Sequence, residues 1–87
     1  MNYIQRSKHF EIRCKQRAIS DDVLNALYIY GEAVDARGGC SKIFFSKKSL
    51  LDIREISRDL YKKVERNRRI YLVLSDDGIA VTAAIAH

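Results

Sequence analysis

The chain has 87 residues, of which 47% are hydrophobic and 31% charged, and its net charge is +5. This composition excludes an intrinsically disordered chain, and the length indicates one small domain over residues 1–87. No apolar run is long enough to cross a bilayer, and the first residues lack the apolar core of a signal peptide, so we expect a cytoplasmic protein without a membrane partner. The positive charge favours an anionic partner, either RNA or an acidic protein surface.

The first predicted helix covers 7–18, with Ser7 as its expected N-cap, and carries a row of basic side chains. His9, Arg13 and Arg17 recur every four residues, so helical winding places them on one ridge. We call these three residues the basic ridge. Arg6 lies near its start. A ridge of this kind is a candidate docking place for negative charge.

Apolar side chains follow the side of this helix next to the basic ridge, and they also form a stripe along the next helix. Phe10 and Cys14 follow a neighbouring ridge that can face a core. A second helix runs from Val23 to Tyr30; Ser20 is its expected N-cap, and Gly31 is the glycine expected just after its end. The first two elements are therefore predicted to be helices joined by a tight corner.

A hairpin is predicted after the second helix. A Gly-Gly pair at 38–39 separates two short extended runs, which is typical of a two-residue hairpin loop. In the register that such a loop imposes, Val34 faces Ile43 and Asp35 faces Lys42, so that apolar residues pair and opposite charges pair.

A third helix is predicted from Ser49 to Glu65, capped by Ser46 or Ser49, with a kink or break at Ser57. The basic stretch of residues 62–69 is interpreted mainly as the helix C-terminus, where cations complement the helix dipole, with nucleic-acid contact as the second interpretation.

The last predicted element is a hairpin around an Asp-Asp-Gly turn at 76–78. Its expected register places three pairs on the core face: Ile70 with Ile85, Leu72 with Ala83, and Leu74 with Val81. The chain is thus predicted to be an α+β domain: two N-terminal helices, a β-hairpin, a third helix and a C-terminal β-hairpin, with a mainly antiparallel four-stranded sheet.

The ordered set of motifs resembles the domain of unknown function 4258 family of small bacterial proteins. The motifs are the helix with the basic ridge, a second helix ending in Tyr-Gly-Glu at 30–32, an aromatic strand ending in Lys47-Lys48, and the terminal hairpin that begins near Tyr71. The resemblance implies a distant kinship with the RelE and ParE toxin fold. It therefore implies a toxin-like, RNA-binding protein with a candidate cognate antitoxin, and a candidate metal-independent endoribonuclease.

Metal-free cleavage of RNA needs an acid and a base near the 2′-hydroxyl and cations around the phosphate. The candidate catalytic residues are His9, Arg13 and Arg17, because an imidazole can exchange protons near neutral pH and guanidinium groups grip phosphates in bidentate fashion. Further candidates for binding nucleic acid or another anion are listed by position: Arg6, Arg37, Lys47, Lys48 and Tyr71, the last through base stacking.

Two other interpretations stay open. The ridge can be an ordinary solvated helix face whose cations pair with Glu11, Asp21 or Asp22. The protein can also be a non-catalytic binding module or inhibitor, of the kind encoded by phages and mobile elements, that offers its basic helix to an acidic protein. Its histidines and cysteines lack zinc-site spacing, so we expect neither a metal nor another cofactor, and Cys14 and Cys40 are expected to be free thiols.

Overall fold

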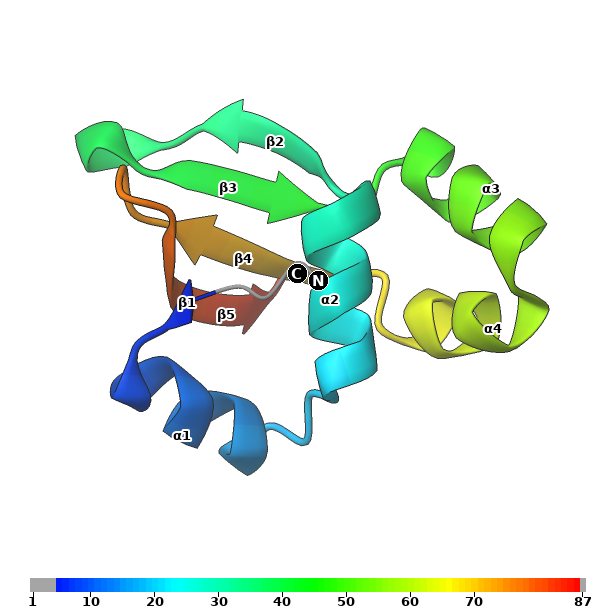
Figure 1. Cartoon of the computed structure of the whole chain (residues 1–87), viewed down its shortest axis with the longest axis horizontal. Coiled ribbons are helices and arrows are strands. Elements are labelled where there is room, and N and C mark those ends of the chain that lie inside the picture. The colour runs from blue at the N-terminus through cyan, green and yellow to red at the C-terminus, as the bar shows by residue number, and fades with distance from the viewer. Residues whose placement is uncertain (1–4, 87) are drawn as a thin grey trace.

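The computed structural model describes residues 5–86, and their side chains from residue 7 onward. It has the α+β architecture that the sequence predicts (Figure 1). The elements in chain order are β1 (Gln5–Arg6), α1 (Lys8–Gln16), α2 (Asp21–Tyr30), β2 (Glu32–Asp35), the 3-10 turn η1 (Arg37–Gly39), β3 (Ser41–Phe44), α3 (Lys47–Ile56), α4 (Arg58–Arg66), β4 (Ile70–Leu74) and β5 (Ile79–Ile85).

The sheet has the strand order β1-β5-β4-β3-β2. Strands β2 to β5 form the expected antiparallel set, and β3 pairs directly with β4 although α3 and α4 separate them in the chain. The short strand β1 adds a parallel edge to β5 through residues 5 and 6. This fifth strand was not predicted, because two residues carry no hydrophobic periodicity.

The core lies between the helices and one face of the sheet. The largest side chains with almost no exposed surface come from every helix and from β4; they are Phe10, Val23, Leu24, Leu27, Ile53, Val64 and Leu72. Helix α2 crosses one face of the sheet, and α3 and α4 lie beyond one end of it, next to α2 (Figure 1). Among the described residues, none of the helices has the length and apolar character needed to cross a bilayer.

Serine hydroxyls set the start of each helix, as the sequence predicts for three of them. The Oγ atoms of Ser7 and Ser20 each accept a hydrogen bond from the backbone N–H of the residue three positions later, at 3.1 and 3.3 Å. Ser46 is the cap of α3, and its backbone N–H donates a hydrogen bond to the hydroxyl of Ser49, which completes a capping box. Ser57 ends α3 and caps α4, so the predicted third helix is two helices divided at the expected break.

The predicted register of the first hairpin is wrong by one residue. Val34 pairs with Lys42, and Asp35 pairs with Ser41. The reason is the loop: η1 uses three residues, with both glycines at positive φ, where a two-residue loop was expected. The longer loop shifts the whole strand, so the predicted pairing of opposite charges is absent.

The terminal hairpin keeps two of its three predicted pairs. Ile70 pairs with Ile85 and Leu72 with Ala83, but Leu74 pairs with Ala80 because a β-bulge shifts the register there. The bulge puts Ala80 on the core face, where it is fully buried. At the other end of the strand Ile85 is 49% exposed, so the predicted core face does not reach that far.

Candidate nucleic-acid interface

Helix α1 is fastened to the sheet through one apolar side. Phe10 is fully buried and Cys14 nearly so, and both belong to the common core. The chain entering the helix is also tied to the sheet, since the Ser7 backbone N–H donates to the Ala80 carbonyl at 3.3 Å. The helix therefore presents its other side to solvent in a fixed orientation.

His9 and Arg13 lie one turn apart on that outer side, as predicted, and both are exposed. Within residues 7–86 no hydrogen bond or ion pair engages either side chain. Glu11 has no ion-pair partner there either, and Asp22 binds Lys63 at 3.0 Å in place of the ridge. For these two acids, the interpretation of the ridge as a locally paired face is therefore not supported.

Arg17 is placed differently from the prediction, because α1 ends at Gln16. Two bonds close the helix in a Schellman motif, from the Ile19 N–H to the Cys14 carbonyl and from the Ala18 N–H to the Lys15 carbonyl. Ala18 takes the left-handed conformation at φ 55° that this motif requires.

The consequence for Arg17 is a contact far along the chain. As the C-cap residue, it turns its guanidinium toward β5 and donates from Nη1 to the Ala83 carbonyl at 3.2 Å. This carbonyl lies beyond the two residues that β1 pairs with. Arg17 thus holds the end of α1 against the sheet while the rest of its side chain stays exposed.

The other predicted cations do not gather beside α1. Arg37 lies in η1, where Gly39 comes close to Asp76 of the terminal turn. Lys47 and Lys48 lie in the first turn of α3, beyond the opposite end of the sheet (Figure 1). The side chain of Arg6 lies outside the described residues. These candidates therefore do not form one site with the basic ridge.

Tyr71 lies on the sheet face opposite the core. It pairs with Phe44 across β3 and β4, and the Lys42 ammonium sits 4.5 Å from the centre of its ring. The tyrosine is half-buried. Since a cation already covers this ring, Tyr71 is less suited to stack on a nucleobase than the sequence suggested.

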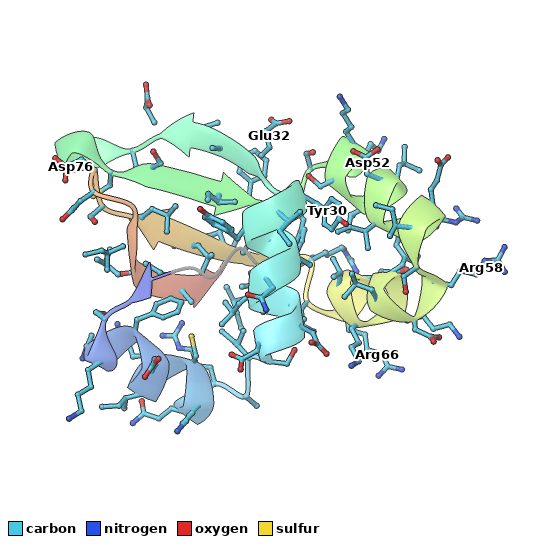
Figure 2. The ribbon with its side chains drawn as sticks, viewed as in Figure 1. Tyr30, Glu32, Asp52, Arg58, Arg66 and Asp76 are labelled. Carbon is cyan, nitrogen blue, oxygen red and sulfur yellow. The ribbon has the colours of Figure 1, made fainter. Side chains whose placement is uncertain are left out.

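The charge of the chain is concentrated in two segments. Residues 6–17 hold five lysines and arginines against one acid, and residues 54–69 hold seven against three. Each segment has a net charge of +4, and the remainder of the chain is net −3. The second segment covers the end of α3, the whole of α4 and the turn before β4, and Figure 2 shows Arg58 and Arg66 pointing into solvent.

The basic side of α4 extends along the whole helix, whereas the sequence predicted mainly a basic C-terminus. Arg58, Lys62 and Arg66 recur every four residues and are exposed. We call these three residues the α4 ridge. The spacing of four residues could have predicted this ridge from the sequence. It was not predicted because the segment was interpreted as part of one continuous helix and its cations as compensation of the helix dipole.

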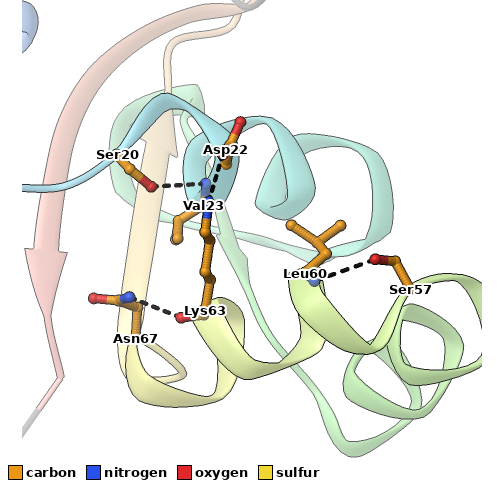
Figure 3. A network of polar contacts seen from close by, with 7 residues as sticks. All are labelled: Ser20, Asp22, Val23, Ser57, Leu60, Lys63 and Asn67. Atoms are coloured by element: carbon orange, nitrogen blue, oxygen red, sulfur yellow. Dashed lines mark hydrogen bonds and ion pairs between the residues drawn. The ribbon is translucent and has the colours of Figure 1, made fainter.

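Helices α2 and α4 are joined by a small polar network (Figure 3). The Lys63 ammonium donates to Asp22 at 3.0 Å, and the Asn67 amide donates to the Lys63 carbonyl at 2.8 Å. Both charged side chains of the pair are more than half exposed, so the pair adds little stability. Its effect is to neutralise one carboxylate in the first turn of α2.

The Asp-Asp-Gly segment is a turn, as predicted. The Ser75 hydroxyl donates to Asp77 at 2.8 Å, and this bond, followed by the backbone N–H of Asp77 and by Asp76, lowers the pKa of the Asp77 carboxyl. Neither Cys14 nor Cys40 is part of a disulfide. The described residues contain no cluster of three or more His, Cys, Asp or Glu that could hold a metal ion, and His87 lies outside them.

Comparison with known proteins gave no relative: no family model, curated protein or solved structure matches the chain. Any statement of function therefore depends on the geometry and charge of the chain itself.

Proposed function

We propose that the protein binds RNA through the exposed side of α1. The observation that carries this proposal is the state of His9 and Arg13: both are exposed on a fixed helix, and no acid in the described chain pairs with them. Cations that no carboxylate neutralises attract a polyanion and release its counterions on binding. Arg17 extends the ridge where the helix meets β5.

Arginine is the suited residue for this task, because its planar fork can bind two phosphate oxygens at once. The rigid mounting of α1 lowers the entropy that binding must overcome, since the helix needs no ordering when RNA arrives. The proposed likeness to the domain of unknown function 4258 family and to RelE-type toxins points to RNA as the polyanion and to an antitoxin as a protein partner.

We expect Arg13→Gln to weaken the binding of single-stranded RNA by about tenfold, which corresponds to one lost charge-assisted hydrogen bond. The slope of log affinity against log salt is expected to become shallower by about 0.7, because one phosphate contact is removed. Fluorescence anisotropy with labelled RNA at several salt concentrations measures both quantities.

The matched control is Arg13→Lys, which keeps the charge and should retain the wild-type salt slope. Circular dichroism checks that both variants fold. If Arg13→Gln retains the wild-type affinity and slope, α1 is not the RNA-binding surface.

Cleavage is the catalytic extension of the proposal, with His9 as the group that exchanges a proton with the 2′-hydroxyl or the leaving oxygen. We expect purified protein to cleave single-stranded RNA in the presence of a chelator, and His9→Ala to reduce the rate by at least about a hundredfold, with a smaller loss of RNA affinity than Arg13→Gln shows. Gel analysis of cleavage products measures this. Equal cleavage by wild type and His9→Ala would assign the nuclease activity elsewhere, and no cleavage by wild type would leave a binding protein.

The non-catalytic protein-binding function is the second candidate, and one observation favours it. Leu51 and Ile56 on α3 are 58% and 61% exposed, which is the kind of surface that a partner covers. Affinity capture that returns one dominant protein after nuclease treatment, together with no affinity for RNA, would establish this function in place of the first.

A further inference from the structure

We infer that the RNA surface continues from α1 across the start of α2 onto α4, where the α4 ridge binds phosphates of the same strand. This inference rests on the proposed function, and it adds a second group of contacts: Arg58, Lys62 and Arg66.

The α4 ridge has the form of a phosphate-binding surface. Its three side chains are exposed, and none of them pairs with an acid within the described residues. Arg58 and Lys62 also line a surface hollow of about 410 Å³ together with Arg54, Tyr61 and one acid, Glu65, and the Tyr61 ring lies 5.9 Å from the Arg54 guanidinium. Cations around a shallow hollow can approach a phosphate from several sides.

The basic surface continues past the end of α4. A second hollow, of about 190 Å³, is lined by Arg66, Asn67, Arg68 and Arg69. Arg66 belongs to this hollow and to the α4 ridge, so the positive surface is continuous from α4 into the turn before β4. A strand lying along α4 would meet cations over the whole length of the helix.

Compensation of the helix dipole does not account for the whole ridge. It explains Arg66, which lies in the last turn, where a cation is favourable. Arg58 is the first residue of α4, where the dipole favours an anion, but it also directly follows the C-terminus of α3, where a cation is favourable. The dipoles do not account for Lys62, which lies in the middle of α4.

The start of α2 connects the two basic surfaces. Only residues 17–20 separate α1 from α2, and Asp22 in the first turn of α2 bonds Lys63 of α4 (Figure 3). Without this bond, the Asp22 carboxylate would repel a polyanion passing from one surface to the other. Lys63 therefore cancels a repulsive charge on the path between the ridges.

The size of the molecule sets the length of RNA that could reach both ridges. Its longest dimension is 34 Å. A stacked strand advances about 3.4 Å per nucleotide, so about ten nucleotides cover this dimension. A strand of about five nucleotides covers about half of this dimension.

The test is the double variant Lys62→Gln/Arg66→Gln, compared with the charge-preserving variant Lys62→Arg/Arg66→Lys. With single-stranded RNA of about fifteen nucleotides, we expect the first variant to make the salt slope shallower by about 1.4 and the second to retain it. Combining the first variant with Arg13→Gln should make the slope shallower by about 2.1 in total, because all three contacts are on one strand.

A second variant tests the path between the ridges. Asp22→Asn is expected to tighten the binding of the long strand by about threefold, because it leaves the Lys63 ammonium without its carboxylate partner and free to attract the strand in screened solvent. With a strand of about five nucleotides held on one ridge, the same variant should have a smaller effect.

The outcomes separate the two proposals. If the double glutamine variant keeps the wild-type slope while Arg13→Gln does not, the extension to α4 is overturned and RNA binding by α1 stands. If the α4 variant changes the slope and Arg13→Gln does not, the α1 proposal falls, and so does a surface shared by both helices. If wild-type protein does not bind RNA, both fall.

Discussion

Phe10→Ala is expected to lower the free energy of unfolding by about 3–5 kcal/mol, the usual cost of removing a fully buried phenylalanine. A domain of this size has a total stability of about 5–15 kcal/mol, so much of it would be lost. Phe10 is also the main apolar anchor of α1, since Cys14 is the only other buried residue of that helix. RNA affinity should fall with it, because the basic ridge would lose its fixed orientation. Urea denaturation followed by circular dichroism measures the stability.

Two variants of the same helix serve as controls for this result. Phe10→Leu leaves a smaller cavity and should cost clearly less than the alanine variant. Ile12→Ala removes a side chain that is 50% exposed and should change stability by less than about 1 kcal/mol. Equal stability of Phe10→Ala and Ile12→Ala would mean that α1 is not held by the core contact described above.

Gly31→Ala is expected to be the second severe variant, with a loss of about 1–3 kcal/mol or more from overpacking. The backbone at Gly31 has φ −66° and ψ 157°, which any residue can adopt. The obstacle is space: an added Cβ would meet the Leu27 carbonyl and would lie 2.5 Å from Cγ2 of Ile43. Thermal unfolding of the variant measures the loss. Glycine is required at this position because a Cβ atom would collide with the Leu27 carbonyl of α2 and with the Ile43 side chain of β3.

Gly78→Ala is the matched control for the glycine variant. Gly78 has φ +83° and open space around it, so alanine there meets conformational strain and no collision. The expected loss is about 1–2 kcal/mol. If Gly31→Ala proves as stable as wild type, the packing of α2 on β3 described here is incorrect.

The parts of the fold that local chemistry determines were predicted well. Ser7, Ser20 and Ser46 act as the expected helix caps, because a cap depends on residues within one turn. Two pairs of the terminal hairpin were also predicted, since alternation of apolar residues fixes which face is buried.

The errors arise where a longer-range contact or one extra residue decides the geometry. A three-residue loop shifted the first hairpin, and a bulge at Leu74 brought Ala80 into the core. Gly31 was expected as the glycine just after the end of α2, whereas the need for glycine there comes from the Leu27 carbonyl and from Ile43 of a neighbouring strand. Periodicity within one segment contains no information on such contacts.

The candidate site shows the same division. Helical spacing alone predicted that His9 and Arg13 share one exposed ridge. The bond from Arg17 to Ala83 could not be predicted, since it joins positions 66 residues apart. The Lys63–Asp22 bond between α4 and the start of α2 could not be predicted either, since it is also a tertiary contact.

The most direct measurement of the central claim is mapping of amide chemical shifts while single-stranded RNA of about fifteen nucleotides is titrated into labelled protein. The account predicts that the largest changes fall in residues 8–17 and 58–69, with small changes in β2 and β3. Changes concentrated on the sheet face around Tyr71, or an unchanged spectrum at saturating RNA, would contradict it.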